Sequence, residues 1–166
     1  MAGYASSLTV AQYRALGYSP APGPYPVAIV DTGAAIAAMT LDEFEMFVWQ
    51  GISILHSSDG LLSLTVEQYT ALGVSVLSGG DGATIPGPSG TVSLTASDEV
   101  TLADTRAALS ALTAARIAEL AGRGIDRVDA TDNLLNLTVA KFNALGTVAL
   151  TVADVVTLSD TGANLA

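Results

Sequence analysis

Two kinds of hydrophobic spacing alternate along this chain. Short runs of β-branched and other apolar residues predict strands, and each run ends in a turn at an aspartate. Between these runs, segments with apolar residues at helical spacing begin after a threonine and end at a glycine, which predicts two-turn helices. Strand and helix therefore alternate about every 28 residues. The expected strands are residues 27–30, 52–55, 100–102, 125–128 and 155–158, and the expected helices follow Thr9, Thr65 and Thr138 or span residues 33–39, 41–50, 106–112 and 114–121.

This pattern recurs with a period of about 56 residues. Residues 8–17 return as residues 64–73 and 137–146, while residues 31–35 return as residues 104–108 and 160–164. Similarity at a fixed period is typical of repeat proteins, in which each unit buries its apolar side against its neighbours. Strands joined by helices run parallel with right-handed crossovers. We therefore expect an α/β repeat solenoid, similar in half-unit length to leucine-rich repeats, with short parallel strands on one side and short helices on the other.

Two segments interrupt the repeat. Residues 74–90 have no counterpart in the other copies and contain a Gly-Gly-Asp-Gly turn and a Pro-Gly-Pro sequence, which predicts an inserted loop. Residues 18–26 are too rich in proline to pair as a central strand, so an irregular cap is expected there. We expect a single repeat-solenoid domain over residues 1–166.

Composition narrows the function classes. Half of the residues are apolar but only 5% are aromatic, so the core must consist mainly of Ala, Val, Leu and Ile. Sixteen acidic against six basic residues give a net charge of −10, which repels phosphate backbones and anionic lipids. The chain has no cysteine, which excludes a disulfide framework and a thiolate metal site. Because of the net negative charge, no nucleic-acid partner is expected. Membrane insertion is not expected either, because no apolar run approaches the roughly 18 residues of a membrane span.

An aspartate follows each predicted strand. If neighbouring strands lie about 4.8 Å apart, successive carboxylates would lie about 5 Å apart and repel each other by about 1 kcal/mol in water. Each carboxylate could relieve this repulsion by accepting backbone N–H bonds at the turn or helix start that follows it. Alternatively, Ca²⁺ could bridge the row, since this ion prefers carboxylate oxygens, and no other cofactor is expected. The aspartates of this row, and thus the candidate Ca²⁺ ligands, are Asp31, Asp59, Asp104, Asp132 and Asp160.

Three further residues are candidates for contact with a partner. Met46 and Trp49 align with Glu119 and Gly122 of the later copy, and they share one helix face. They either pack under the irregular cap or form a contact patch. Asp81 lies in the Gly-Gly-Asp-Gly turn, which is similar to the glycine-rich calcium-binding turns of secreted repeat proteins. Because the turn occurs in a single copy, the alternative interpretation is a plain surface turn.

Catalysis has few candidate residues. His56 is the only histidine, and its counterpart in the next copy is Asp129. Ser57 and Asp59 lie nearby in sequence, yet three residues leaving one strand cannot supply the geometry of a catalytic triad. An enzyme would need a pocket that brings His56 to carboxylates from another segment. We expect no enzymatic activity.

The repeated words resemble tandem repeats in very large secreted or surface proteins of Gram-negative bacteria, including adhesin-like proteins and type I secretion substrates. The words are Leu-Thr-Val-Ala-x-(Tyr/Phe)-x-Ala-Leu-Gly and Asp-Thr-Gly-Ala-x-(Leu/Ile), and the resemblance covers nearly the whole chain outside residues 74–90. It implies an extracellular or cell-surface location and a stalk or scaffold role. The first residues show no signal peptide of the usual secretory kind.

The expected function is a non-enzymatic structural or scaffolding repeat segment of a bacterial extracellular or surface protein. Its expected partners are neighbouring repeats of a longer chain or further copies that associate end to end. The alternative is a binding module for a glycan, a protein or Ca²⁺, which would use the insertion at residues 74–90 and the face of Met46 and Trp49.

Overall fold

The computed structural model describes residues 6–17, 19–21, 27–73 and 92–165. Over these residues the chain is an α/β protein with parallel strands in three sheets and helices between them, which confirms the expected class. The inserted loop expected at residues 74–90, including Asp81, lies outside the described residues, as do residues 18 and 22–26 of the expected cap.

The chain forms two compact units. The N-terminal unit comprises Met1–Leu62 and Glu67–Asp98, and the C-terminal unit comprises Ser63–Val66 and Glu99–Ala166. A single domain over residues 1–166 stays a prediction. The strands are β1 (Ser6–Leu8), β2 (Val27–Asp31), β3 (Ile52–Ser57), β4 (Leu61–Leu64), β5 (Ser93–Leu94), β6 (Glu99–Asp104), β7 (Arg127–Ala130), β8 (Leu134–Leu137), β9 (Ala149–Leu150) and β10 (Val155–Leu158). The helices are α1 (Val10–Leu16), α2 (Gly33–Ala37), α3 (Leu41–Gln50), α4 (Val66–Gly73), α5 (Arg106–Ala111), α6 (Ala114–Ala118), α7 (Val139–Ala144) and α8 (Gly162–Leu165), with a 3₁₀ turn at Ala121–Arg123.

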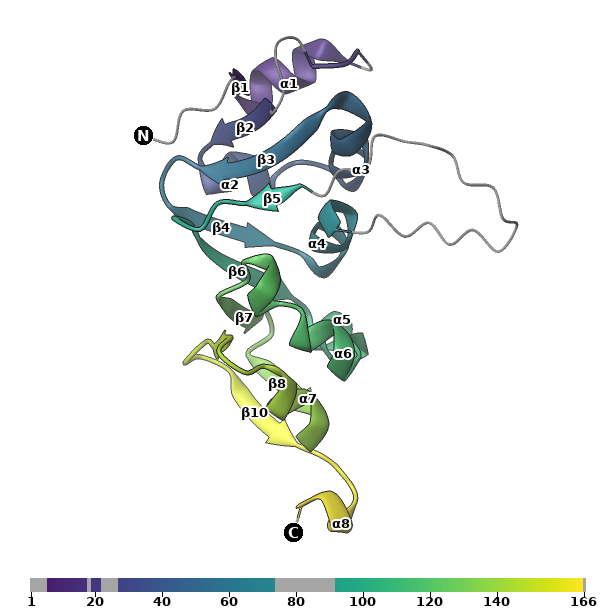
Figure 1. The fold of residues 1–166 in the computed structure, drawn as a ribbon. Helices are drawn as coiled ribbons and strands as arrows, with labels where there is room; N and C mark the ends of the chain where they lie inside the picture. The colour runs from purple at the N-terminus through teal and green to yellow at the C-terminus, as the bar shows by residue number, and fades with distance from the viewer. Residues whose placement is uncertain (1–5, 18, 22–26, 74–91, 166) are drawn as a thin grey trace, which may run out of the picture. The chain divides into compact units, whose positions relative to one another are not determined.

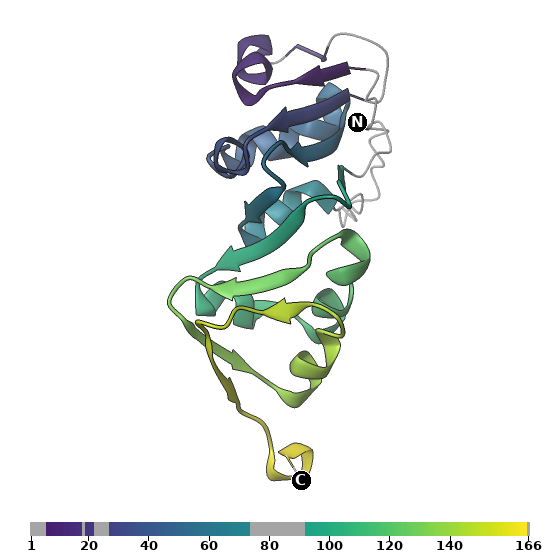
Figure 2. The same ribbon diagram turned by 90° about the vertical axis from the view of Figure 1, so that its left-hand side faces the viewer.

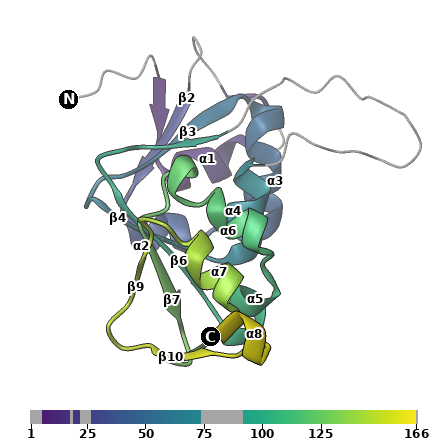
Figure 3. The ribbon, with the colours of Figure 1, turned by 60° about the horizontal axis from the view of Figure 1, so that its bottom comes forward.

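Parallel pairing links strands that are far apart in the sequence. In the N-terminal unit, β1, β2, β3 and β5 lie side by side in that order (Figure 1). The second sheet has the order β4-β6-β7-β9, and β8 pairs with β10 in the third (Figure 2). Helices α1 and α3 lie on one side of the first sheet and contact β2 and β3 (Figure 3). The helices that precede β2 and β3 thus cover the sheet that these two strands form.

The helices begin at the threonines that the sequence indicates. The Thr9 hydroxyl accepts the N–H of Gln12 at 3.2 Å, and the Gln12 side chain accepts the N–H of Thr9 at 2.8 Å, which forms a capping box. Thr40 and Glu43 repeat this arrangement at the start of α3, and Gly51 ends that helix in the left-handed region with φ 83°. The same hydroxyl-to-N3 bond is present at Thr32, Thr105, Thr113 and Thr138.

The strands are more numerous than the sequence predicts. After the turns at Asp59 and Asp132 the chain continues into β4 and β8, which were not expected. Their alternation of exposed and buried residues is typical of a strand, but four residues are too few to separate a strand from a loop by pattern. β7 also begins at Arg127, two residues later than expected.

The core of the N-terminal unit contains an aromatic cluster. Phe47 packs edge-on against Tyr13 with ring centroids 5.2 Å apart and lies 5.1 Å from Phe44, and all three side chains are buried. Such pairs add about 0.5–1.5 kcal/mol beyond the area that they bury. The largest fully buried side chains of the C-terminal unit are instead aliphatic, including Leu102, Leu109, Leu120 and Ile125.

Gly33, the first residue of α2, lies against the chain that leaves β3. A Cβ atom at this position would lie 1.8 Å from the carbonyl oxygen of Leu61 and 3.2 Å from the Ser57 hydroxyl. The equivalent Gly162 has no atom within 4 Å of such a Cβ. Of these two equivalent glycines, only Gly33 therefore needs to be glycine for steric reasons.

We expect Gly33→Ala to lower the free energy of unfolding by about 1–3 kcal/mol, because the backbone of Leu61 must move away from the new methyl group. Gly162→Ala is the matched control and should be neutral or stabilising by up to about 1 kcal/mol. Urea unfolding followed by circular dichroism measures both variants. Equal effects of the two substitutions would contradict the close approach at Gly33.

Candidate functional site

The most regular polar feature of the structure is the set of strand-end aspartates, Asp31, Asp59, Asp104, Asp132 and Asp160. Asp31 and Asp104 are the last residues of β2 and β6, and Asp160 follows the end of β10 by two residues. Asp59 lies in the turn between β3 and β4, and Asp132 lies in the turn between β7 and β8. Every member is thus placed where a strand turns towards the next element.

At Asp31 the carboxylate makes two bonds in different directions. One oxygen accepts the N–H of the following residue, Thr32, at 2.8 Å. The other accepts the N–H of Val10, the first residue of α1, at 3.0 Å and 21 positions earlier in the chain. The carboxylate therefore joins the strand end of one segment to the helix start of the preceding segment.

Asp104 and Asp160 repeat this arrangement. Asp104 accepts the N–H of Thr105 at 2.7 Å and that of Val66, the first residue of α4, at 3.0 Å. Asp160 accepts the N–H of Thr161 at 2.8 Å and that of Val139, the first residue of α7, at 3.1 Å.

The two turn aspartates bind the first N–H groups of helices α2 and α5. Asp59 accepts the N–H of Gly33 at 3.0 Å and a hydrogen bond from the Ser57 hydroxyl. Asp132 accepts the N–H of Arg106, the first residue of α5, at 3.3 Å, and its other oxygen lies 3.9 Å from the Arg106 guanidinium.

These bonds satisfy groups that short helices leave open. The first N–H groups of a helix have no acceptor within the helix, and a negative charge near them is favourable. A cap of this kind stabilises by about 1 kcal/mol. The acceptor role agrees with the structural interpretation of the row, but the sequence indicated acceptance from the residues that follow, and the bond to the preceding helix could not be foreseen.

Calcium bridging stays a prediction. Among the described residues, no group of three or more acidic or histidine side chains is arranged to hold a metal ion. Asp31, Asp104 and Asp160 accept backbone N–H bonds with both carboxylate oxygens, whereas Asp59 and Asp132 do so with one oxygen each.

A second set of aspartates was missed by the sequence analysis. Asp98 is buried and accepts the N–H of Ser57 at 2.8 Å, while Asp154 accepts the N–H of the equivalent Ala130 at 3.1 Å. Asp126 accepts the N–H of Val100 at 2.8 Å. The signal for Asp98 and Asp154 was the repeated Thr-x-x-Asp spacing, which forms a turn in both copies.

His56 lies beside a carboxylate from another segment. Its Nδ1 atom is 2.9 Å from one oxygen of Asp98 and 3.1 Å from the other. The neighbouring Ser57 is buried, and its hydroxyl bonds to Asp59 and to the carbonyl of Leu61. Because successive strand residues point to opposite faces, Ser57 is not placed as a nucleophile for His56.

Three carboxyl groups are held in the ionised form by their partners. The Ser57 hydroxyl lowers the pKa of Asp59, and the Asn164 amide lowers the pKa of Asp160. The pKa of Glu43 is lowered mainly by its hydrogen bond to Arg14, whose Nε atom lies 2.7 Å away. Burial raises the pKa of Tyr13 to about 12.

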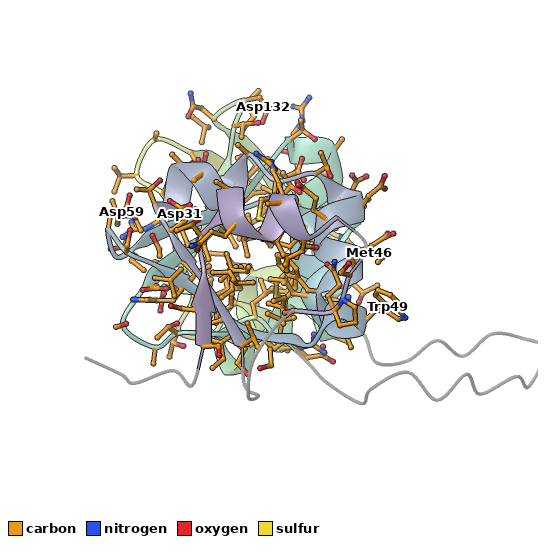
Figure 4. The ribbon with its side chains drawn as sticks, turned by 90° about the horizontal axis from the view of Figure 1, so that it is seen from above. Asp31, Met46, Trp49, Asp59 and Asp132 are labelled. Carbon is orange, nitrogen blue, oxygen red and sulfur yellow. The ribbon has the colours of Figure 1, made fainter. Side chains whose placement is uncertain are left out.

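The candidate contact residues lie away from these aspartates. Within the N-terminal unit, Met46 and Trp49 lie on the side opposite to Asp31 and Asp59 (Figure 4). Trp49 is 54% exposed, whereas Met46 is partly buried. Whether this face contacts a partner stays a prediction.

The described residues contain no helix that is both long enough and apolar enough to span a membrane. Comparison with known proteins produced no match to a protein-family model, a curated protein or a solved structure.

We expect Asp104→Ala to lower the free energy of unfolding by about 1–2 kcal/mol, because the N–H groups of Val66 and Thr105 lose their acceptor. Glu45→Ala removes an equal charge from the exposed face of α3 and should change stability by less than about 0.5 kcal/mol. Urea unfolding at neutral pH measures both. Calcium that raises the melting temperature of the parent chain but not of Asp104→Ala would instead support metal bridging.

The lowered pKa of Glu43 makes stability depend on pH. Its folded pKa lies below the unfolded value of about 4.3, so the pair with Arg14 stabilises the fold above that value and loses its effect as the pH falls through the folded pKa. Arg14→Gln should therefore reduce the loss of unfolding free energy between about pH 5 and pH 3. Urea unfolding over this range measures the effect, which should be absent when Arg14→Gln is made in a Glu43→Gln background.

Proposed function

We propose that the chain is a non-enzymatic structural repeat segment, an α/β solenoid that scaffolds a bacterial extracellular or surface protein. The observation that carries this proposal is the recurrent bond from a strand-end aspartate to the first N–H of a helix in the preceding segment. It occurs at α1, α2, α4, α5 and α7, each time within one of the two compact units. A bond that ties each segment to the next is what a stack of equivalent segments requires.

Other contacts recur in both units at equivalent positions. The Gln68 side chain donates to the carbonyl of Ala37 at 3.1 Å, and its equivalent Lys141 donates to the carbonyl of Ser110. Residues 37 and 110 occupy the same place in the repeat, six positions after Asp31 and Asp104. Recurrence of side-chain contacts supports a repeat in three dimensions as well as in sequence.

The short helices support the same interpretation. Isolated helices of fewer than about 12 residues are marginal in water, and the helices of the described residues have ten residues or fewer. Packing and capping by neighbouring segments must therefore stabilise them. Segments of this kind supply mutual support and present few groups suited to catalysis.

The location outside the cell rests on the resemblance of the repeated words and on the net charge of −10. Charge of one sign keeps an extended array soluble. A binding module remains the second candidate, and the 54% exposure of Trp49 favours it, because aromatic residues commonly anchor contacts with partners.

Removal of one whole period tests the repeat architecture. Deletion of residues 105–160 joins Asp104 to Thr161 and preserves the Asp-Thr junction. We expect this shortened chain to fold with parallel-strand and helix content per residue unchanged and to unfold cooperatively at a lower temperature, since it has fewer neighbouring contacts. Circular dichroism and thermal unfolding measure both properties.

Deletion of residues 105–146 is the matched control, because it removes fewer residues but joins Asp104 to Thr147 out of register. This variant should lose cooperative unfolding. If the two deletions behave alike, the segments are not interchangeable and the solenoid proposal is wrong.

A further inference from the structure

Two apolar positions of β10 are exposed although the same positions are buried in the earlier copies. Val156 is 36% exposed and Leu158 is 42% exposed. Counted back from the strand-end aspartates Asp160, Asp104 and Asp31, they match Val100 (1%) and Leu102 (0%) in β6, and Val27 (0%) and Ile29 (0%) in β2.

The earlier copies also show what covers these positions. β3 pairs in parallel with β2, and Leu55 lies opposite Ile29. β7 pairs in the same way with β6, and Val128 lies opposite Leu102. β10 pairs with β8 along one edge, and no strand of the described residues pairs with its other edge (Figure 1).

The backbone at the strand end is equivalent too. The carbonyl of Asp31 accepts the N–H of Ser58 at 2.8 Å, and the carbonyl of Asp104 accepts the N–H of Thr131 at 2.9 Å. Both donors directly follow the covering strand. Asp160 is the residue of the last copy that is equivalent to Asp31 and Asp104.

A pocket lies beside α7 in the same unit. It has a volume of about 460 Å³ and is lined by Phe142, Asn143, Leu145, Gly146, Val148 and Leu150. Phe142 is 44% exposed, whereas the equivalent Tyr13 of the first copy is 4% exposed.

In the first copy, α3 covers the equivalent place. The Phe47 ring packs on Tyr13, and the Tyr13 hydroxyl donates to the carbonyl of Glu43 at 2.9 Å. The Gln50 side chain donates to the carbonyl of Gly17, the equivalent of Gly146, at 2.7 Å. The carbonyl of Gln50 accepts the N–H of Ala21, the equivalent of Leu150, at 2.9 Å.

The two covering elements are consecutive in the chain. α3 ends at Gln50, Gly51 makes the left-handed turn, and β3 begins at Ile52. One continuous helix–glycine–strand segment therefore fills both the helix position and the strand position in the first copy.

We propose that the pocket beside α7 and the free edge of β10 together bind one helix–glycine–strand segment of the α3–β3 type, contributed by a further repeat of this kind. The segment would place an aromatic residue against Phe142, an amide side chain at the carbonyl of Gly146, and a parallel strand along Val156 and Leu158. This inference rests on the proposed repeat architecture and specifies which surface receives the next repeat and in which register.

A chimera tests the proposal in one polypeptide. Residues 1–161 are followed by a second copy of residues 33–73, which preserves the Asp-Thr-Gly junction and supplies α3 and β3 in register. Hydrogen exchange followed by mass spectrometry reports on residues 155–160. We expect exchange in this segment to slow by roughly tenfold or more relative to the parent chain, because new strand pairing protects its amides.

Two variants of the chimera serve as a matched pair. Leu158→Glu places a charge against the incoming strand and should abolish the added protection. Val152→Glu makes the same change in charge at a fully exposed turn position and should leave the protection intact. Exchange at residues 99–104 shows in each case that the C-terminal unit is folded.

Several results would overturn the proposal. The first is an unchanged rate of hydrogen exchange at residues 155–160 in a chimera whose C-terminal unit is folded. Another is concentration-dependent protection in the parent chain together with a doubled mass in sedimentation, because the β10 edges of two copies would then pair with each other.

If the chimera is insoluble, a synthetic peptide of residues 40–60 is added to the parent chain, with a scrambled peptide as control. Protection of residues 155–160 by the native sequence alone supports the proposal, and no protection at millimolar peptide overturns it. The whole-period deletion described above tests the repeat architecture separately, so it can succeed where this docking surface fails.

Discussion

Each short helix of this chain begins with a backbone N–H that cannot find an acceptor within the helix. A carboxylate from the segment that follows provides that acceptor at five places, and the same carboxylate usually binds the N–H of the residue next to it. The local bond orients the side chain, and the distant bond fixes the neighbouring segment. A two-turn helix, a strand end and a sheet register are thus stabilised together, and loss of one affects the other two.

Aspartate is well suited to this position because its side chain is short and has two oxygens. A serine or threonine hydroxyl caps its own helix from the position before it, as Thr32 and Thr105 do. Asp31 and Asp104, one residue earlier, must span the distance to another segment while also serving their own. The acidic character of the chain follows in part from this requirement, because the repeat needs one such carboxylate for each of these helices.

The local features of the fold were predictable from the sequence, and the contacts between segments were only partly so. Threonine caps and glycine ends marked helix α3 with both of its boundaries correct, because these signals act within one turn. The strands β4 and β8 were missed because a four-residue alternation carries little information. The candidate site was recognised as a row of aspartates, yet the first N–H of the preceding helix is 21 to 38 residues away, and its approach depends on sheet register. The burial of Asp98 beside His56 was missed for the same reason.

The aspartate bonds also bear on how the chain folds. Each one closes a loop of only a few tens of residues, and the parallel strand pairs that accompany it have similar separations. Contacts of such limited range carry a modest loop-closure entropy and favour rapid folding. Each newly synthesised segment therefore brings the carboxylate that completes the helix start of the segment before it, so native structure can build up progressively from the N-terminal end of the chain.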